Sequence, residues 1–329
     1  MAYDGRIMQR ALTRFDEDKQ RRAAQLEQRR RTAYARAPRL AEIEAELRGT
    51  MGRIISSALA RGTDPVPAIR VLRDENLQLQ QERAELLASL GYPADYLEEK
   101  PACAKCGDTG YVSGGVCACL RAYYAREQLA ELSRLLPLGE DSFETFSFDW
   151  YDSAVQPAFG ISPRENMERN YDVCRDYAYQ FAKGSGDLLL SGGTGLGKTF
   201  LSACIARVVS ENGFSVVYDT AASVFSRFED AKFRRDDGGS EDADRCMRCD
   251  LLILDDLGTE MTTSFVQSAL YQIVNGRLMA GRSTIISTNL APEEIGSRYG
   301  QAVRSRLEGE YEILPFFGDD IRRLKRERQ

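Results

Sequence analysis

The segment GGTGLGKT at residues 192–199 is the most informative part of this 329-residue chain. It fits the pattern GxxxxGK[ST], follows the apolar run DLLLS and leads into a segment with helical periodicity. Glycines let the backbone turn so that successive N–H groups point inward at a phosphate, beside the positive end of the following helix. The other interpretation is a glycine-rich turn before an ordinary helix, and the strand–loop–helix setting favours a phosphate-binding loop.

The residues of this loop have expected roles in holding a nucleotide. The Lys198 ammonium is expected to reach the β- and γ-phosphates, and the Thr199 hydroxyl is expected to bind Mg²⁺. The predicted nucleotide contacts of the loop are Gly192, Gly193, Thr194, Gly195, Leu196, Gly197, Lys198, Thr199 and Phe200. The expected cofactors are therefore ATP or ADP together with Mg²⁺.

Two adjacent carboxylates, Asp255 and Asp256, end the apolar run LLILDD. Acids directly after a buried strand are costly unless a cation or a water chain receives them. We expect Asp255 to be the second magnesium ligand beside Thr199, and Asp256 to orient or deprotonate the attacking water. The alternative is a pair of helix-capping acids after a strand.

Polar residues further along complete the predicted catalytic set of Lys198, Asp256, Asn289 and Arg306. Asn289 ends the apolar run TIISTN, where it can hold the attacking water or the γ-phosphate. The alternative is that Asn289 only forms a turn at the end of the strand, which is the usual role of Asn there. Arg306 lies near the end of a predicted helix, and it is either an arginine finger for a neighbouring subunit or a solvated surface residue.

Apolar runs alternate with amphipathic helices from residue 160 onward. The runs DLLLSG, SVVYD, LLILDD, TIISTN and YEILPF are continuous rather than alternating, which indicates strands covered on both faces. The sheet is therefore expected to be mainly parallel, with helices on either side. The helices are predicted at residues 198–210, up to 225, 264–279 and near 301. The acidic stretch at residues 236–244 is predicted to be an exposed loop.

Residues 6–90 are rich in good helix formers with apolar residues at helical spacing. A turn at residues 62–65 separates two such stretches, which predicts an antiparallel helix pair preceded by a more charged helix. This region either only holds chains together or binds a partner protein, and the second interpretation is favoured.

Four cysteines in the arrangement CxxC, ten residues, CxC follow the helical region: Cys103, Cys106, Cys117 and Cys119. Without a sign of secretion, this spacing favours a structural zinc site over disulfides, and free or redox-active thiols are the alternative. Cys246 and Cys249 form a second CxxC without a neighbouring pair, so we interpret them as core or helix-face residues. Cys174 and Cys204 are predicted to be core residues as well.

The composition excludes several classes of function. The chain has no histidine, which rules out histidine-dependent catalytic triads, histidine-ligated metals and an imidazole general base. No apolar run is long enough to span a bilayer and no signal peptide is evident, so the cytoplasm and no membrane partner are expected. The net charge of −6 restricts any DNA contact to local patches. The candidates for single-stranded DNA are Arg227, Lys232, Phe233, Arg234 and Arg235, unless this stretch is a solvated loop.

From FETFSFDWY through GGTGLGKT, LLILDDLGTE, ISTNL, SRLEG and GDDIRR, the chain resembles the AAA+ ATPase domain of bacterial replicative helicase loaders of the DnaC and DnaI type. These loaders are related to the IstB transposition ATPases. The resemblance implies a five-stranded parallel sheet, ATP and Mg²⁺, self-association with an active site shared between neighbours, and an approach of Arg322 to the nucleotide. Two features depart from generic AAA+ proteins: Asp256 stands where Glu is usual, and the 14 residues after Pro315 leave no room for a lid domain. Both suggest slow hydrolysis suited to a switch.

The sequence thus predicts an α/β AAA+ P-loop domain without a lid, preceded by a helical domain with a four-cysteine zinc knuckle. The predicted regions are 1–100 for partner binding, 101–120 for the knuckle, 121–159 as a helical and extended linker, and 160–329 as the ATPase domain. The expected function is ATP-dependent loading of a replicative helicase onto single-stranded DNA. The alternatives are an IstB-like transposition helper that binds DNA and recruits a transposase, and a nucleotide-dependent assembly factor that never touches DNA.

Overall fold

The computed structural model describes residues 3–59, 66–135, 142–233 and 237–327. The chain divides into two compact units, one formed by Thr13–Cys117 and the other by Met1–Leu12 together with Ala118–Gln329. Within the described ranges, no helix is both long and apolar enough to cross a membrane.

The larger unit is built on a five-stranded sheet in which every neighbouring pair of strands is parallel. The strand order is β4-β5-β6-β3-β7. Apolar side chains on both faces of the central strands are buried, as the continuous apolar runs predict. The predicted five-stranded parallel sheet is therefore confirmed. The strands are β3 (Asp187–Gly192), β4 (Val216–Thr220), β5 (Leu251–Leu257), β6 (Ser283–Thr288) and β7 (Tyr311–Phe316).

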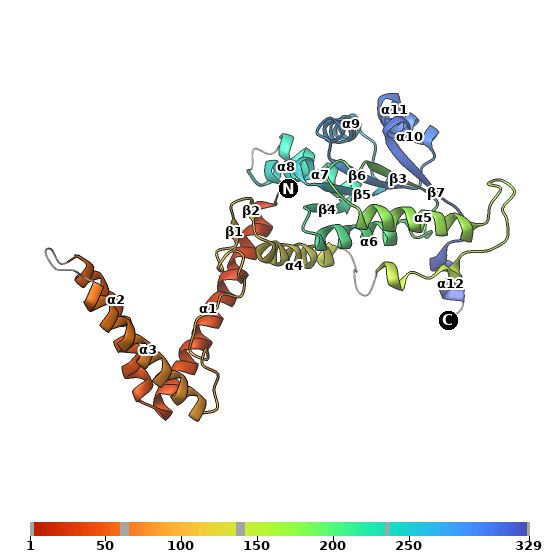
Figure 1. Cartoon of the computed structure of the whole chain (residues 1–329). Coiled ribbons are helices and arrows are strands. Elements are labelled where there is room, and N and C mark those ends of the chain that lie inside the picture. Colours follow the sequence, from red (N-terminus) through yellow and green to blue (C-terminus); the bar gives the residue numbers. More distant parts are fainter. Residues whose placement is uncertain (1–2, 60–65, 136–141, 234–236, 328–329) are drawn as a thin grey trace. The chain divides into compact units, whose positions relative to one another are not determined.

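Helices cover both faces of this sheet (Figure 1). One apolar core lies between the sheet and α4 (Ala118–Leu135), α5 (Pro163–Tyr179) and α6 (Lys198–Glu211). A second core packs the other face against α7 (Ala221–Phe233), α8 (Asp237–Arg248), α9 (Ser264–Met279), α10 (Pro292–Tyr299) and α11 (Gln301–Glu310). Two short 3₁₀ turns, η1 (Phe143–Thr145) and η2 (Phe148–Trp150), precede α5, and α12 (Ile321–Glu327) follows β7.

The predicted loop at residues 236–244 is wrong, because helix α8 begins at Asp237. Ala243, Cys246 and Met247 stand at helical spacing and pack into the second core. Burial of this apolar stripe stabilises a helix whose composition alone indicates a solvated loop. Helix α7 also extends beyond the predicted end at Phe225, to Phe233.

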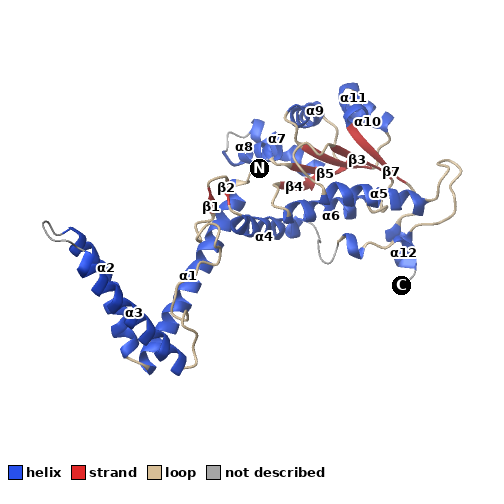
Figure 2. Ribbon diagram, viewed as in Figure 1, coloured by secondary structure: helices blue, strands red, loops and turns tan. Residues whose placement is uncertain are grey.

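The smaller unit is helical apart from one short hairpin (Figure 2). Ion pairs join the start of one long helix to the end of the next, from Arg39 to Glu82 at 2.9 Å and from Arg83 to Glu44 at 2.8 Å. The predicted antiparallel pair is thus present, and its turn at residues 62–65 lies outside the described residues. The elements are α1 (Gly5–Arg36), α2 (Arg39–Leu59), α3 (Val66–Ser89), β1 (Tyr111–Val112) and β2 (Gly115–Val116).

The compact units do not coincide with the predicted regions. The first turns of α1 contact α4: the Asp4 N–H donates to the Tyr124 hydroxyl at 3.0 Å, and Arg10 pairs with Glu131. Because α4 packs against α6 and β4, these contacts place the beginning of the chain in the larger unit.

Candidate functional site

The phosphate loop joins β3 to α6 and depends on glycine at two points of close approach. A Cβ on Gly192 would lie 1.9 Å from the carbonyl oxygen of Phe316 on the neighbouring strand. Gly195 has φ +72°, and a Cβ there would lie 2.0 Å from the Asp320 carboxylate. A side chain at either position would displace the loop from its neighbours, so these glycines fix its path.

Lys198 is the first residue of α6, and its side chain folds back into the loop. Its ammonium donates to the carbonyl oxygens of Gly192 at 2.7 Å and Gly193 at 2.6 Å. The residue is 6% exposed, and burial lowers the pKa of Lys198, while the nearby charges of Asp256 and Asp255 oppose that effect. A desolvated ammonium in a ring of loop carbonyls can pass its hydrogen bonds to phosphate oxygens.

The two predicted acids reach the same site because β5 is irregular at its end. The register with β6 shifts between Leu254 and Leu257, and Asp256 has φ +54°, in the left-handed region. In a regular strand, neighbouring side chains point to opposite faces. With the irregularity, Asp255 lies 3.5 Å from the Thr199 hydroxyl while Asp256 faces the cavity in front of the loop.

The environment of Asp256 differs from that of a solvated aspartate. Partial burial raises the pKa of Asp256, and the neighbouring charge of Asp255 adds to this effect. The positive charges of Lys198 and Arg322 act in the opposite direction. A carboxylate with a raised pKa in a cavity is a suitable proton acceptor for water.

A cavity of about 420 Å³ lies in front of the loop, bounded on one side by aromatic residues. Phe146, Trp150 and Tyr151 line it together with Phe200 of α6. The rings of Phe146 and Phe200 lie 5.4 Å apart, and the Tyr151 hydroxyl donates to the carbonyl oxygen of Leu196 at 3.1 Å. This apolar, aromatic wall next to the phosphate loop can pack against a nucleotide base.

The sequence did not predict a binding role for this aromatic segment. The signal was present, since five aromatic residues occur between Phe143 and Tyr151. Phe146, Phe148 and Trp150 alternate with other residues, which indicates an extended segment, whereas the structure forms the 3₁₀ turns η1 and η2 there. The alternation therefore did not indicate which rings face the loop.

The remaining predicted residues fall into two groups. Asn289 and Arg322 line the same cavity as Asp256 and the loop residues Thr194–Phe200, so the structure brings them together. Arg306 lies elsewhere on α11, where it is exposed and 3.7 Å from Glu310. The structure therefore does not bring Arg306 to the cavity of its own chain.

The candidates for DNA contact lie at the end of α7. The ammonium of Lys232 lies 5.6 Å from the ring centroid of Phe233 and 5.4 Å from that of Phe265, and Phe233 is 66% exposed. Arg227 forms an ion pair with Asp219. Arg234 and Arg235 lie outside the described residues.

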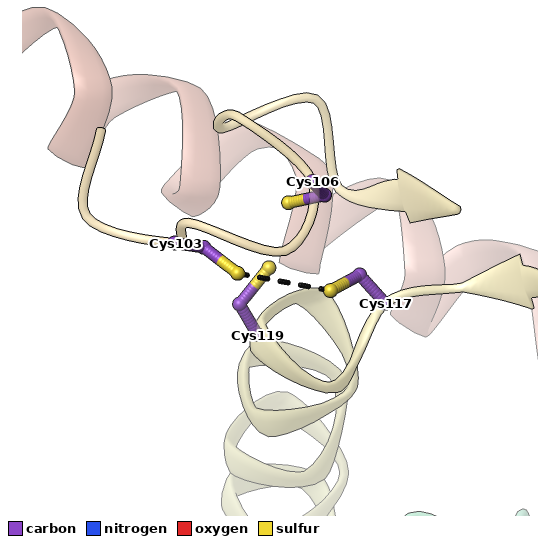
Figure 3. Close-up of side chains that lie close together, drawn as sticks. All are labelled: Cys103, Cys106, Cys117 and Cys119. Atoms are coloured by element: carbon purple, nitrogen blue, oxygen red, sulfur yellow. Dashed lines mark hydrogen bonds between the residues drawn. The ribbon is translucent and has the colours of Figure 1, made fainter.

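The four predicted knuckle cysteines lie together (Figure 3). Their sulfur atoms are all within 4.8 Å of one another, and those of Cys103 and Cys117 are 3.8 Å apart. Thiolates bound at about 2.3 Å in a tetrahedron around zinc lie about 3.8 Å from one another. The donor set and its spacing thus fit a structural zinc ion.

The other cysteines are core residues, as predicted. Burial raises the pKa of Cys246 to about 12 and also raises the pKa of Cys249, which disfavours the thiolates that metal binding requires. Both are in the second core, whereas Cys174 and Cys204 are in the first.

Comparison with known proteins finds sequences related to the C-terminal part of the chain. Residues 173–328 match the family described as IstB-like ATP binding protein. The uncharacterized protein YdaV of Escherichia coli is 31% identical over 161 residues, which are 45% of this chain and 64% of that protein. The replicative helicase loader DnaC of Escherichia coli is 30% identical over 135 residues, which are 40% of this chain and 54% of DnaC. The chain thus spans less than two thirds of the length of either relative.

Among solved structures, the DnaC helicase loader aligns with 55% of this chain and 99% of its own, at 20% identity and a TM-score of 0.46. The DnaI structure aligns with 46% of this chain and 86% of its own, at 18% identity and a TM-score of 0.42. The family match and the curated relatives confirm what the motifs predicted: the C-terminal part of the chain resembles the IstB-like and DnaC-type AAA+ proteins.

Proposed function

We propose that this protein is an ATP-dependent DNA replication factor that binds a replicative helicase and loads it onto single-stranded DNA. One observation carries the nucleotide part of the proposal: the phosphate loop, Asp256, Asn289 and Arg322 surround a single cavity. The similarity to DnaC supports the loader part.

Nucleotide binding follows from the groups around this cavity. The loop N–H groups and Lys198 bind the phosphates, and the aromatic wall with Trp150 holds the base. Thr199 and Asp255 are the residues that would hold Mg²⁺, which neutralises charge on the β- and γ-phosphates when it is bound. The resemblance implies an approach of Arg322 to the nucleotide, and its position in the lining of the cavity supports this role.

Hydrolysis is assigned to Asp256 and Asn289. Asp256 accepts a proton from the attacking water, and Asn289 orients that water or the γ-phosphate. An aspartate reaches less far than the glutamate usual in AAA+ proteins, so we propose slow turnover, with ATP binding as the clamp and hydrolysis as the release. We assign Arg306 to the nucleotide of a neighbouring copy, because it pairs with Glu310 and does not line the nucleotide cavity of its own chain.

The proposed partners are a replicative helicase, single-stranded DNA and further copies of the chain. The helical region of residues 1–100 and the zinc knuckle are assigned to helicase binding. Lys232 and Phe233 supply a cation and an exposed ring, the combination that binds single strands by charge and stacking.

The second candidate function is an IstB-like transposition helper that binds DNA and recruits a transposase. The family match over residues 173–328 favours it, because that family is named for the IstB-like proteins. The same nucleotide chemistry serves both functions, so the partner protein distinguishes them.

Co-purification with the replicative helicase of the host, with and without ATP, tests the proposal. We expect the native chain to retain the helicase, and a Cys103→Ser/Cys106→Ser variant to retain less because the knuckle is disrupted. Cys174→Ser, which changes a core cysteine outside the knuckle, is the control. Retention of a transposase in place of the helicase would establish the second candidate.

A further inference from the structure

Hydroxyl groups from the two strands that flank β5 hold the carboxylate of Asp255. The Tyr218 hydroxyl of β4 donates to Asp255 Oδ2 at 2.6 Å. The Ser287 hydroxyl of β6 donates to Asp255 Oδ1. Asp255 is 4% exposed, Tyr218 is 3% exposed and Ser287 is fully buried. The buried carboxylate therefore accepts hydrogen bonds from both neighbouring strands of the sheet.

Ser287 also acts on the irregular end of β5. Its hydroxyl oxygen accepts a hydrogen bond from the Asp256 N–H at 2.9 Å. This bond stabilises the backbone where Asp256 takes its left-handed conformation. One side chain of β6 thus fixes the carboxylate of the first acid and the backbone of the second.

The two oxygens of the Asp255 carboxylate have different partners, and one of them also lies near the phosphate loop. Oδ2 accepts a hydrogen bond from Tyr218, whereas Oδ1 accepts one from Ser287 and also lies 3.5 Å from the Thr199 hydroxyl. A hydrogen bond of 2.6 Å from a hydroxyl to a carboxylate is in the short, charge-assisted range. Such a bond fixes the rotation of the carboxyl group, since turning it would leave a buried charged oxygen without its donor.

We infer that Tyr218 and Ser287 are positioning residues, which orient Asp255 toward Thr199 so that the two together bind a divalent cation with the nucleotide. The inference rests on the proposed nucleotide site and adds residues outside its motifs. The Tyr218 hydroxyl is the donor that contacts Oδ2 of Asp255. Removing this donor weakens the contribution of the cation to nucleotide binding and leaves the loop's own phosphate contacts in place.

Tyr218→Phe is the test variant, because it removes the hydroxyl and keeps the ring that packs in the first core. Tyr311→Phe is the matched control: Tyr311 is a buried tyrosine of β7 in the same sheet, and it does not line the cavity. Ser287→Ala removes the other donor and provides a second variant in case Tyr218→Phe is unstable.

The measurement is the calorimetric affinity for ADP with excess Mg²⁺ and with EDTA in place of Mg²⁺. We expect Mg²⁺ to strengthen ADP binding equally in the native protein and Tyr311→Phe. In Tyr218→Phe and Ser287→Ala this gain falls about tenfold, the usual effect of losing a residue that orients a metal ligand. The affinity in EDTA stays within about twofold, which separates positioning from a general loss of structure.

An unchanged Mg²⁺ gain in both test variants would overturn the inference and leave the proposed function intact. An equal loss of affinity in Mg²⁺ and in EDTA would also overturn it, because that result indicates a structural role. A native protein that binds no ADP in either buffer would overturn the proposed function, and the inference with it.

Discussion

Asp256 combines a backbone conformation and a charge environment that few residues satisfy. Its φ of +54° is tolerated by Asp and Asn better than by most residues, and its carboxylate faces the cavity. Asp256→Asn keeps the conformation and removes the proton acceptor. We expect ATP affinity to change by about twofold at most, and hydrolysis to fall about 100-fold or more, measured as phosphate release. Hydrolysis at the native rate would assign the proton transfer to another group.

The raised pKa of Asp256 also predicts the pH dependence of hydrolysis. The carboxylate works in its deprotonated form, so activity is present above its pKa and is lost as the pH falls through it. Because burial and Asp255 raise that pKa, half of the activity is lost at a higher pH than the value of about 3.9 for a free aspartate. A rate profile of the native protein between neutral pH and pH 4 checks this. More than half of the neutral-pH activity remaining at pH 4 would contradict the assignment.

At the scale of elements, the knuckle loop depends on one buried carboxylate. Asp108 has φ +57° and accepts hydrogen bonds from the N–H groups of Ala102 at 3.0 Å and Cys103 at 2.9 Å. It also pairs with Arg22 of α1 at 3.0 Å. Asp108→Ala frees the loop that presents Cys103, so we expect zinc affinity to fall about tenfold in competition with a chelator.

The control for this prediction is Asp95→Ala, which removes a half-exposed carboxylate paired with Lys100 in the same unit. We expect it to keep the native zinc affinity. Native affinity in Asp108→Ala would show that the four cysteines hold the ion without help from this loop contact.

The elements that could be predicted are those whose signal is local. The five apolar runs form strands in the structure, and GGTGLGKT predicted the loop between β3 and α6. Both signals lie in neighbouring residues, as apolar periodicity in one case and glycine spacing in the other. The irregularity at Asp255 and Asp256 could not be predicted, since it depends on Ser287 from another strand. Helix α8 was missed because its stability comes from packing of Cys246 and Met247 in the second core.

For the assembled protein, the position of Arg306 away from the nucleotide cavity of its own chain predicts that two inactive variants restore ATP hydrolysis when they are mixed. Arg306→Ala is expected to bind ATP and to hydrolyse it at least about tenfold more slowly, since finger arginines contribute 10³–10⁵-fold in related phosphoryl transfers. Mixing this variant with Lys198→Ala restores hydrolysis, because each Lys198→Ala copy still offers Arg306 to a neighbour.

Arg304→Ala is the control on the same helix, where Arg304 pairs with Glu308 at 2.8 Å. It is expected to hydrolyse ATP at the native rate. Mixtures of Arg306→Ala and Lys198→Ala that stay inactive would assign Arg306 to a role other than a finger.

We expect the loop entered from β3 to bind ATP through Lys198 with magnesium present. Calorimetry of the purified chain titrated with ATP and Mg²⁺ tests this expectation. We predict saturable binding of one ATP per chain in the native protein, and loss of that binding in Lys198→Ala. No detectable binding by the native protein, or equal binding by both, would contradict the claim.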